Sequence, residues 1–184
     1  MISRRRNSKK LKSLMREARS LVFLDECHYQ RGTSIRTWCH PEGRDSTVLE
    51  ETNRKGISVF GAVNIDDGKL LTGFTDKYNA MTFLEFLCIV RSRFPNGVIV
   101  LDNALYHHAS IVTDCAFLTG MDLLFMPPYS PELNSIERVW KLAKMHATYN
   151  KYFQRLNDLE SALEGEFGKY SKRNREPKSL CAIT

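Results

Sequence analysis

The sequence has no long hydrophobic run. Its longest apolar stretches, such as residues 98–101 and 123–126, fall far short of the roughly 20 residues that a membrane-spanning helix needs. No apolar segment follows Met1, as it would in a secretory signal peptide. The sequence also contains no internal repeat and no low-complexity segment. We therefore expect an ordinary globular protein with no membrane partner.

Cysteine is scarce and follows no pairing pattern. There are five cysteines, an odd number, and no CxxC motif, which disfavours a disulfide framework and indicates a reducing cytoplasm. Cys27-His28 and Cys39-His40 repeat two zinc donor types after twelve residues. Paired ligands of structural zinc sites lie two to four residues apart, however. We therefore interpret these residues as thiols and ordinary polar histidines.

One compact domain fits the 184 residues, of which 42% are hydrophobic and 26% charged. The net charge of +6 is unevenly distributed. Residues 1–19 carry eight basic side chains against one acidic one, residues 21–137 carry nine against fifteen, and residues 138–184 carry ten against five. Basic ends suit a polyanion and an acidic middle suits metal cations, although an unevenly charged solvated surface is an open alternative. We expect a basic arm or linker over 1–19 and a basic polar tail over 171–184.

Hydrophobic periodicity predicts that strands alternate with helices. The expected strands are 20–25, 57–65, 69–74, 98–102 and 121–126, and the expected helices are 79–94, 107–118, 134–149 and 157–170. The second and third strands form a hairpin across Asp66-Asp67-Gly68. Parallel strands need helical crossovers, and both faces of such a sheet must be covered. The order therefore indicates an α/β fold, with a mixed five-stranded sheet and helices on both faces.

Three acids lie where a ligand site is expected. Asp25 and Asp102 end buried strands, and ligands of open α/β sheets bind at the carboxyl ends of the strands. Glu137 opens a late helix. The alternatives are ordinary turn and cap roles, since Asn134-x-x-Glu137 also matches a capping box, in which the acid bonds back to the backbone of Asn134. Spacing alone leaves both interpretations open.

The local sequence around these acids favours function. The relevant segments are Leu24-Asp25-Glu26, then Val100-Leu101-Asp102-Asn103-Ala104 followed by His107, and then 127–134 leading into Ile136-Glu137 and Trp140. Thirty-four residues separate Asp102 from Glu137. In these features the sequence resembles the catalytic domain of mariner-type DDE transposases, in the branch found in bacterial and archaeal insertion sequences. We expect this domain to span residues 20–170.

The resemblance implies a ribonuclease H-like fold that brings Asp25, Asp102 and Glu137 together on divalent metal. It implies two ions, Mg²⁺ or Mn²⁺, with Asp25 bridging both and each of the other acids holding one. Electrostatics agrees, because carboxylates about 4 Å apart repel by roughly 4 kcal/mol per pair at an effective dielectric near 20 and need cations to be tolerated. Oxygen-only ligands favour Mg²⁺ or Mn²⁺ over zinc.

The implied activity is DNA transposition. Two metal ions can activate an attacking oxygen and stabilise the leaving oxygen at phosphorus. By resemblance, water first cleaves DNA at the ends of an insertion sequence. The freed 3′-hydroxyl then attacks target DNA, usually at a TA dinucleotide. DNA, as element ends and as target, is therefore the expected partner, in the cytoplasm and associated with the nucleoid.

Neighbouring residues receive supporting roles. Asn103 and His107 match the family motif and are expected either to orient water, phosphate or a metal-bound carboxylate, or simply to cap the next helix. Glu26 follows a ligand on a strand, so its side chain is expected on the opposite face. Trp140 is interpreted as core packing. Arg138, Lys141 and Lys144 are candidates for DNA phosphate contacts, with a solvated helix face as the alternative.

One departure from the family lies before the catalytic acids. Relatives carry a helix-turn-helix region there that recognises the element ends, and only 24 residues precede Asp25. We expect end recognition to need a separate or missing domain, and a homodimer to form in the complex that pairs two ends. The alternatives are a non-catalytic DNA-binding relic of a transposase and a ribonuclease H-like nuclease of other specificity.

Overall fold

A computed structural model describes residues 20–31, 55–128 and 133–181. Three sequence expectations fall outside these ranges: the basic arm over 1–19, the Cys39-His40 pair, and residues 129–132 of the proline-rich segment. Among the described residues, no helix combines the length and the apolar character that crossing a membrane requires.

The core of the structure is a five-stranded sheet in the order β3-β2-β1-β4-β5. Its strands are β1 (Leu21–Gln30), β2 (Gly56–Asn64), β3 (Leu70–Thr75), β4 (Val98–Leu101) and β5 (Asp122–Phe125). β1, β2 and β3 pair antiparallel, whereas β4 pairs parallel to both β1 and β5. The predicted mixed sheet is confirmed, and β1 forms its centre.

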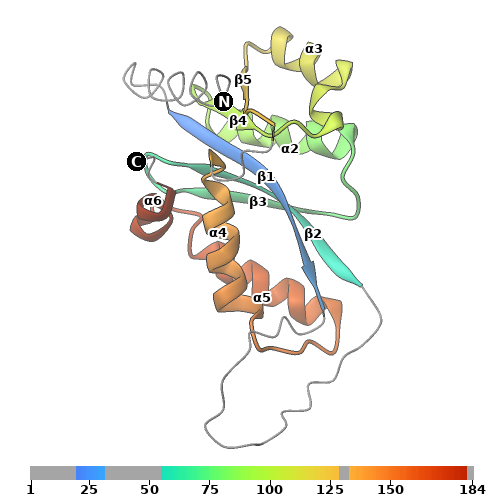
Figure 1. The fold of residues 1–184 in the computed structure, drawn as a ribbon, viewed down its shortest axis with the longest axis vertical. Coiled ribbons are helices and arrows are strands. Elements are labelled where there is room, and N and C mark those ends of the chain that lie inside the picture. Colours follow the sequence, from blue (N-terminus) through green and yellow to red (C-terminus); the bar gives the residue numbers. More distant parts are fainter. Residues whose placement is uncertain (1–19, 32–54, 129–132, 182–184) are drawn as a thin grey trace, which may run out of the picture.

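Helices cover both faces of this sheet (Figure 1). α2 (Ala80–Arg93) and α3 (Ser110–Leu118) pack on one face. α4 (Ile136–Ala143) and α5 (Leu156–Gly168) pack on the other, and α6 (Arg175–Cys181) lies against α4. Because successive side chains of a strand point to opposite faces, β1 contributes to two separate hydrophobic cores.

The alternation along β1 assigns its residues to these cores. Phe23 belongs to the core beneath α4 and α5 and packs in the same cluster as Trp140. Leu24 belongs to the core beneath α2 and packs in the same cluster as Phe83. Residue 25 therefore lies on the α4 face, and residue 26 lies on the α2 face.

The predicted start of α2 at Asn79 is confirmed. The Asn79 side chain accepts hydrogen bonds from the backbone N–H groups of Met81 and Thr82, at 2.9 and 3.1 Å. The Thr82 hydroxyl in turn lies 3.3 Å from the Asn79 N–H and accepts its hydrogen bond. This reciprocal cap satisfies backbone donors that the first turn of a helix leaves without partners.

Two element boundaries differ from those expected. β1 does not end at Asp25 but continues to Gln30, because residues 26–30 pair with residues 56–60 of β2. The long helix expected over 134–149 is shorter as an α-helix. It runs as α4 only to Ala143 and continues as η3 (Lys144–Thr148), a π-helical turn. Hydrophobic spacing does not distinguish these two helix types.

The segment expected as a basic polar tail contains α6. Its Cys181 side chain is fully buried, and the thiol donates to the backbone carbonyl of Ser135 at 3.3 Å. A seven-residue helix containing Pro177 carries little helical signal of its own. Its order comes from packing against α4, which sequence periodicity does not report.

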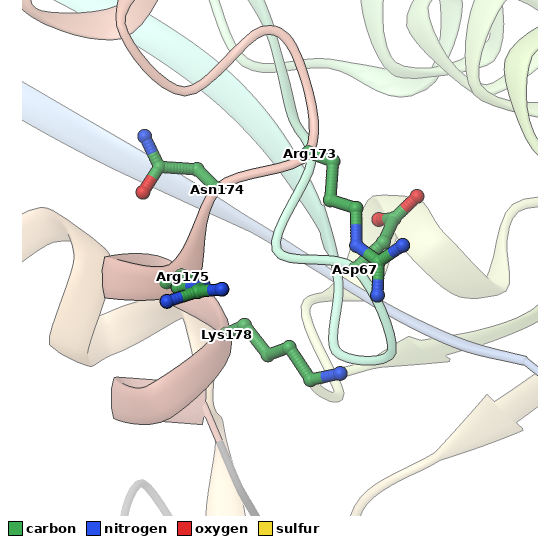
Figure 2. Close-up of a pocket in the computed structure, with 5 residues that line it drawn as sticks. All are labelled: Asp67, Arg173, Asn174, Arg175 and Lys178. Carbon is green, nitrogen blue, oxygen red and sulfur yellow. The ribbon is translucent and has the colours of Figure 1, made fainter.

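The start of α6 meets the β2–β3 turn. Gly68 has a φ of +71°, and a Cβ there would lie 2.2 Å from the Asn174 carbonyl oxygen, so a larger residue would separate the two segments. The Asn174 N–H also donates to the Asp67 carbonyl at 3.0 Å. A hollow of about 560 Å³ lies at this junction (Figure 2), lined by Asp67, Arg173, Asn174, Arg175 and Lys178.

Candidate active site

The register between β1 and β4 brings the first two predicted acids side by side. Phe23 of β1 pairs with Val100 of β4 in parallel, so Asp25 and Asp102 follow two residues later at the same level of adjacent strands. β4 ends at Leu101, which places Asp102 in the loop that leaves the sheet. The parallel pairing thus brings together the backbone positions of two acids that are 77 positions apart in the sequence.

Asp25 is a buried carboxyl with only one nearby side-chain donor in the described contacts. Its side chain is 7% exposed, and the Trp140 indole N–H donates to Oδ2 at 3.2 Å. Burial, helped by the negative charges of Glu26, Glu137 and Asp102, raises the pKa of Asp25 to about 8. An isolated buried carboxylate of this kind is unfavourable, and a bound cation would reverse the penalty.

Glu137 lies in the first turn of α4, above Asp25. Ser135, not Asn134, is the N-cap residue, and it makes no side-chain cap bond. Glu137 is therefore the second residue of the helix, whereas a capping box has its acid at the third. The capping interpretation fails on this geometry. The negative charge of Glu137 instead helps to raise the pKa of Asp25.

Asp102 belongs to a hydrogen-bond network with His107. Its Oδ1 accepts a hydrogen bond from the Ala104 N–H at 2.9 Å and lies 2.9 Å from Nδ1 of His107. The hydrogen bond from His107 is the largest influence on Asp102 and lowers the pKa of that carboxyl. Asp102 is thus held as a carboxylate. Both contacts use Oδ1, which leaves Oδ2 outside the network.

His107 bridges two acids from a fully buried position in η1 (Leu105–His108). Its Nε2 lies 3.0 Å from Oε1 of Glu26. Burial disfavours the imidazolium, but the hydrogen bonds to Asp102 and Glu26 outweigh burial and raise the pKa of His107 to about 9. At neutral pH this histidine is a cation between two carboxylates.

Glu26 is the residue whose role sequence reasoning underestimated. It lies on the α2 face as expected, yet His107 connects it to Asp102. Among the described residues, only Glu26, Asp102 and His107 form a group of three His, Cys, Asp or Glu side chains whose ligand-type atoms all lie within 4.8 Å of one another. The predicted trio of Asp25, Asp102 and Glu137 does not form such a group. Two sequence features could have indicated this role of Glu26: it directly follows Asp25, and a histidine follows Asp102 by five residues.

Asn103 fixes the loop that carries Asp102. Its side-chain amide donates to the backbone carbonyl of Met126, just beyond β5. The Met126 N–H donates in turn to the Leu101 carbonyl at 2.8 Å. The loop after β4 is therefore tied to the end of the neighbouring strand, and Asn103 acts on Asp102 through the backbone.

The sequence model of the DDE superfamily endonucleases matches residues 20–160, most of the chain. The chain belongs to this superfamily. Its matched region begins just before β1 and extends into α5, so it contains all three predicted acids. It also contains His107, which the family motif indicated, and Glu26, which the structure adds to the site.

Solved structures share the fold of this DDE superfamily chain. The Mos1 strand transfer complex has a TM-score of 0.75 at 17% identity, over 97% of this chain and 56% of the Mos1 chain. The Mos1 transposase catalytic domain with raltegravir and Mg has a TM-score of 0.63 at 14% identity, over 99% and 95% of the two chains. The predicted ribonuclease H-like fold is confirmed. The chain spans little more than half of the Mos1 chain in the first complex.

A curated relative comes from Sinorhizobium fredii. This uncharacterized protein, y4pE/y4sA, is 31% identical over 64 residues, which cover 35% of this chain and 45% of the relative. The match is too short to carry an activity across.

The three basic residues predicted to contact DNA phosphates lie in different environments on and after α4. Arg138 donates to the Leu180 carbonyl at 2.6 Å and so ties α4 to α6. The Lys144 ammonium lies 5.7 Å from the centroid of the Tyr29 ring. Lys141 is exposed. Among the three predicted phosphate contacts, Lys141 is therefore the one with an exposed side chain.

The raised pKa values of Asp25 and His107 predict how pH affects the stability of the metal-free protein. Asp25 and His107 both have a raised pKa in the folded chain, so at these two groups the folded state binds more protons than the unfolded state between pH 5.5 and 8.5. Stability then falls as pH rises, through about 8 for Asp25 and about 9 for His107. We expect the melting temperature to drop by at least about 2–4 °C between pH 5.5 and 8.5, the equivalent of 1 kcal/mol.

Calorimetry of the chelator-treated protein across this pH range measures the effect. Asp25→Asn removes one of the two groups and should flatten the profile, whereas Asp114→Asn on the exposed surface of α3 should not. A melting temperature that rises steadily to pH 8.5 would contradict the assignment of Asp25 as a buried, protonated carboxyl.

Proposed function

We propose that this chain is the catalytic domain of a metal-dependent DNA transposase. It would cleave DNA strands and join the freed 3′-hydroxyl to target DNA. The proposal is supported by the placement of Asp25 on β1 beside the loop after β4 that carries Asp102, and by the negative charges of Asp102 and Glu137 that help to raise the pKa of Asp25, in a DDE superfamily domain. Their donors are all oxygen, which is the ligand set of Mg²⁺ and Mn²⁺.

The three acids would hold two divalent ions, with Asp25 shared between them. Such ions supply activation of the attacking oxygen and stabilisation of the leaving oxygen during displacement at phosphorus. The chain's own residues prepare the site. His107 keeps Asp102 ionised, Asn103 fixes its loop, and burial leaves Asp25 dependent on a cation for ionisation.

A strand-transfer assay tests this function against the two alternatives. A labelled, pre-cut element end with a free 3′-hydroxyl is incubated with supercoiled plasmid, Mn²⁺, the protein and the proposed end-recognition domain. Covalent transfer of label to the plasmid is the expected result. Nicking without transfer would contradict the transposase and favour a nuclease of other specificity. Binding without nicking or transfer would favour a non-catalytic relic.

The proposed DNA partner would contact more than one basic surface. Lys141 is exposed on α4, and the hollow beside α6 gathers three cationic side chains (Figure 2), those of Arg173, Arg175 and Lys178. Each neutralised phosphate releases counterions and strengthens binding at any sequence. TA as the target, end recognition by a separate helix-turn-helix domain, a homodimeric complex and nucleoid association remain parts of the proposal.

The salt dependence of DNA binding measures each surface separately. Lys141→Ala is expected to lower the slope of log affinity against log salt by about 0.9, the value of one phosphate contact. The double variant Arg175→Ala/Lys178→Ala is expected to lower it by up to about 1.8. Fluorescence anisotropy with a duplex at several salt concentrations gives the slopes. An unchanged slope in both variants would remove these surfaces from the DNA interface.

A further inference from the structure

The Trp140 indole lies between α4 and the centre of the sheet, directly over Gly61. Gly61 of β2 pairs with Asp25 of β1. A Cβ at Gly61 would lie 2.2 Å from Cη2 of Trp140 and 2.6 Å from its Cζ2. The missing side chain at this position is therefore what allows the indole to reach the backbone beside Asp25.

This close approach aims the indole N–H at the acid. Nε1 of Trp140 donates to Oδ2 of Asp25 at 3.2 Å, and both side chains are buried, at 2% and 7% exposure. Phe167 of α5 packs edge-on against the indole, with 6.0 Å between ring centroids. The ring is thus confined by β2 and by α5, so the donor has little freedom to turn away.

The same helix delivers Glu137 and Trp140. Residues three apart lie on one face of an α-helix, and α4 has no irregularity between residues 137 and 140. The helix therefore places an acid and an indole donor together over β1. A tryptophan that only packed in the core could donate its N–H to any nearby acceptor. Here the acceptor is the carboxylate of Asp25, a predicted metal ligand.

We propose that Trp140 is a positioning residue for Asp25. Its N–H bond to Oδ2 fixes the rotation of the carboxylate, and Gly61 provides the space in which the indole does so. The proposal rests on the proposed metal site. Partners that orient metal ligands are typically worth 10–100-fold in metal affinity or activity, so the indole N–H is expected to strengthen Mn²⁺ binding by about that factor.

Trp140→Phe tests the N–H, since it keeps an aromatic ring in the core. We expect Mn²⁺ affinity, measured by calorimetry, to fall by about 10-fold or more. Gly61→Ala should lower it as well, because the added Cβ displaces the indole. Phe86→Leu on α2 is the matched control. It truncates a buried aromatic of the other core, so it should lower the melting temperature and leave Mn²⁺ affinity unchanged.

Fluorescence gives a second reading that does not depend on activity. The sequence contains two tryptophans, Trp38 and Trp140, so a Trp38→Phe background leaves Trp140 as the only indole. Paramagnetic Mn²⁺ bound beside Asp25 should quench its emission. Diamagnetic Mg²⁺ should not quench it and should displace Mn²⁺. Adding Asp25→Asn to this background should abolish the quenching.

The outcomes separate the inference from the function on which it rests. If the wild-type chain binds no Mn²⁺, the proposed function fails and the positioning role fails with it. If Asp25→Asn loses Mn²⁺ binding while Trp140→Phe retains wild-type affinity, the metal site stands and the positioning role is wrong. A selective loss in Trp140→Phe and Gly61→Ala, with Phe86→Leu unaffected, supports it.

Discussion

Asp102→Asn is expected to abolish Mn²⁺-dependent DNA nicking by this chain while leaving the fold intact. Asp102 is half-exposed and its pKa is lowered, so it is an ionised ligand and not a core residue. Asn has nearly the same shape but supplies no negative charge, and the metal would lose a ligand that neutralises it. We expect a loss of at least about 100-fold, since removal of a single charge-stabilising group commonly costs that much.

A plasmid-nicking assay, with circular dichroism on the same samples, measures activity and fold together. Asp114→Asn is the matched control, because Asp114 is an exposed acid on α3. The control should nick DNA at the wild-type rate. Equal cleavage by wild type and Asp102→Asn would show that the nicking comes from elsewhere.

His107→Ala is expected to damage both stability and activity. The variant removes a fully buried cation and leaves Glu26, 13% exposed, without its 3.0 Å partner. Breaking a buried ion pair on one side typically costs 3–5 kcal/mol. Because Asp102 on the other side is half-exposed, we expect a loss near the lower end, about 3 kcal/mol. Nicking should fall by about 10–100-fold, because Asp102 loses its orienting partner.

Denaturant unfolding measures the loss of unfolding free energy in His107→Ala. A double variant shows whether this loss comes from the buried charge of Glu26. In Glu26→Gln/His107→Ala no charge is left buried without a partner, so the double variant should lose less stability than the two single variants added together. Asp114→Asn is again the control, since this acid is exposed on α3. Strict additivity of the two single changes would contradict the Glu26–His107 ion pair.

The sheet and the first helix could be predicted because each has a local signal. The apolar runs of β1 and β4 mark buried strands, and Asn79 and Pro95 bracket α2. The end of β1 could not be placed, because residues 26–30 are strand only through their pairing with β2. α6 could not be predicted either, since its order comes from contact with α4.

In the site, too, the features with a local sequence signal could be predicted and those that depend on distant contacts could not. Asp25, Asp102 and Glu137 could be chosen from local motifs. Asn103 and His107 could also be named from the family motif as residues that orient a metal-bound carboxylate. The contacts of His107 with Glu26 and of Trp140 with Asp25 could not be predicted, because each crosses a large sequence distance. His107 reaches Glu26 across 81 positions, and Trp140 reaches Asp25 across 115. The residue type alone does not predict either contact. A tryptophan on an apolar helix face, for example, normally packs in the core.

Anomalous scattering from Mn²⁺ is the most direct test of the central claim, that Asp25, Asp102 and Glu137 form one divalent metal site. Crystals of the protein grown with Mn²⁺ and a duplex bearing a 3′-hydroxyl end would supply the data. The account predicts anomalous peaks within ligand distance of carboxylate oxygens from all three residues, with Asp25 contributing to each peak. Well-ordered Mn²⁺ bound only elsewhere, with these carboxylates free of metal, would contradict it.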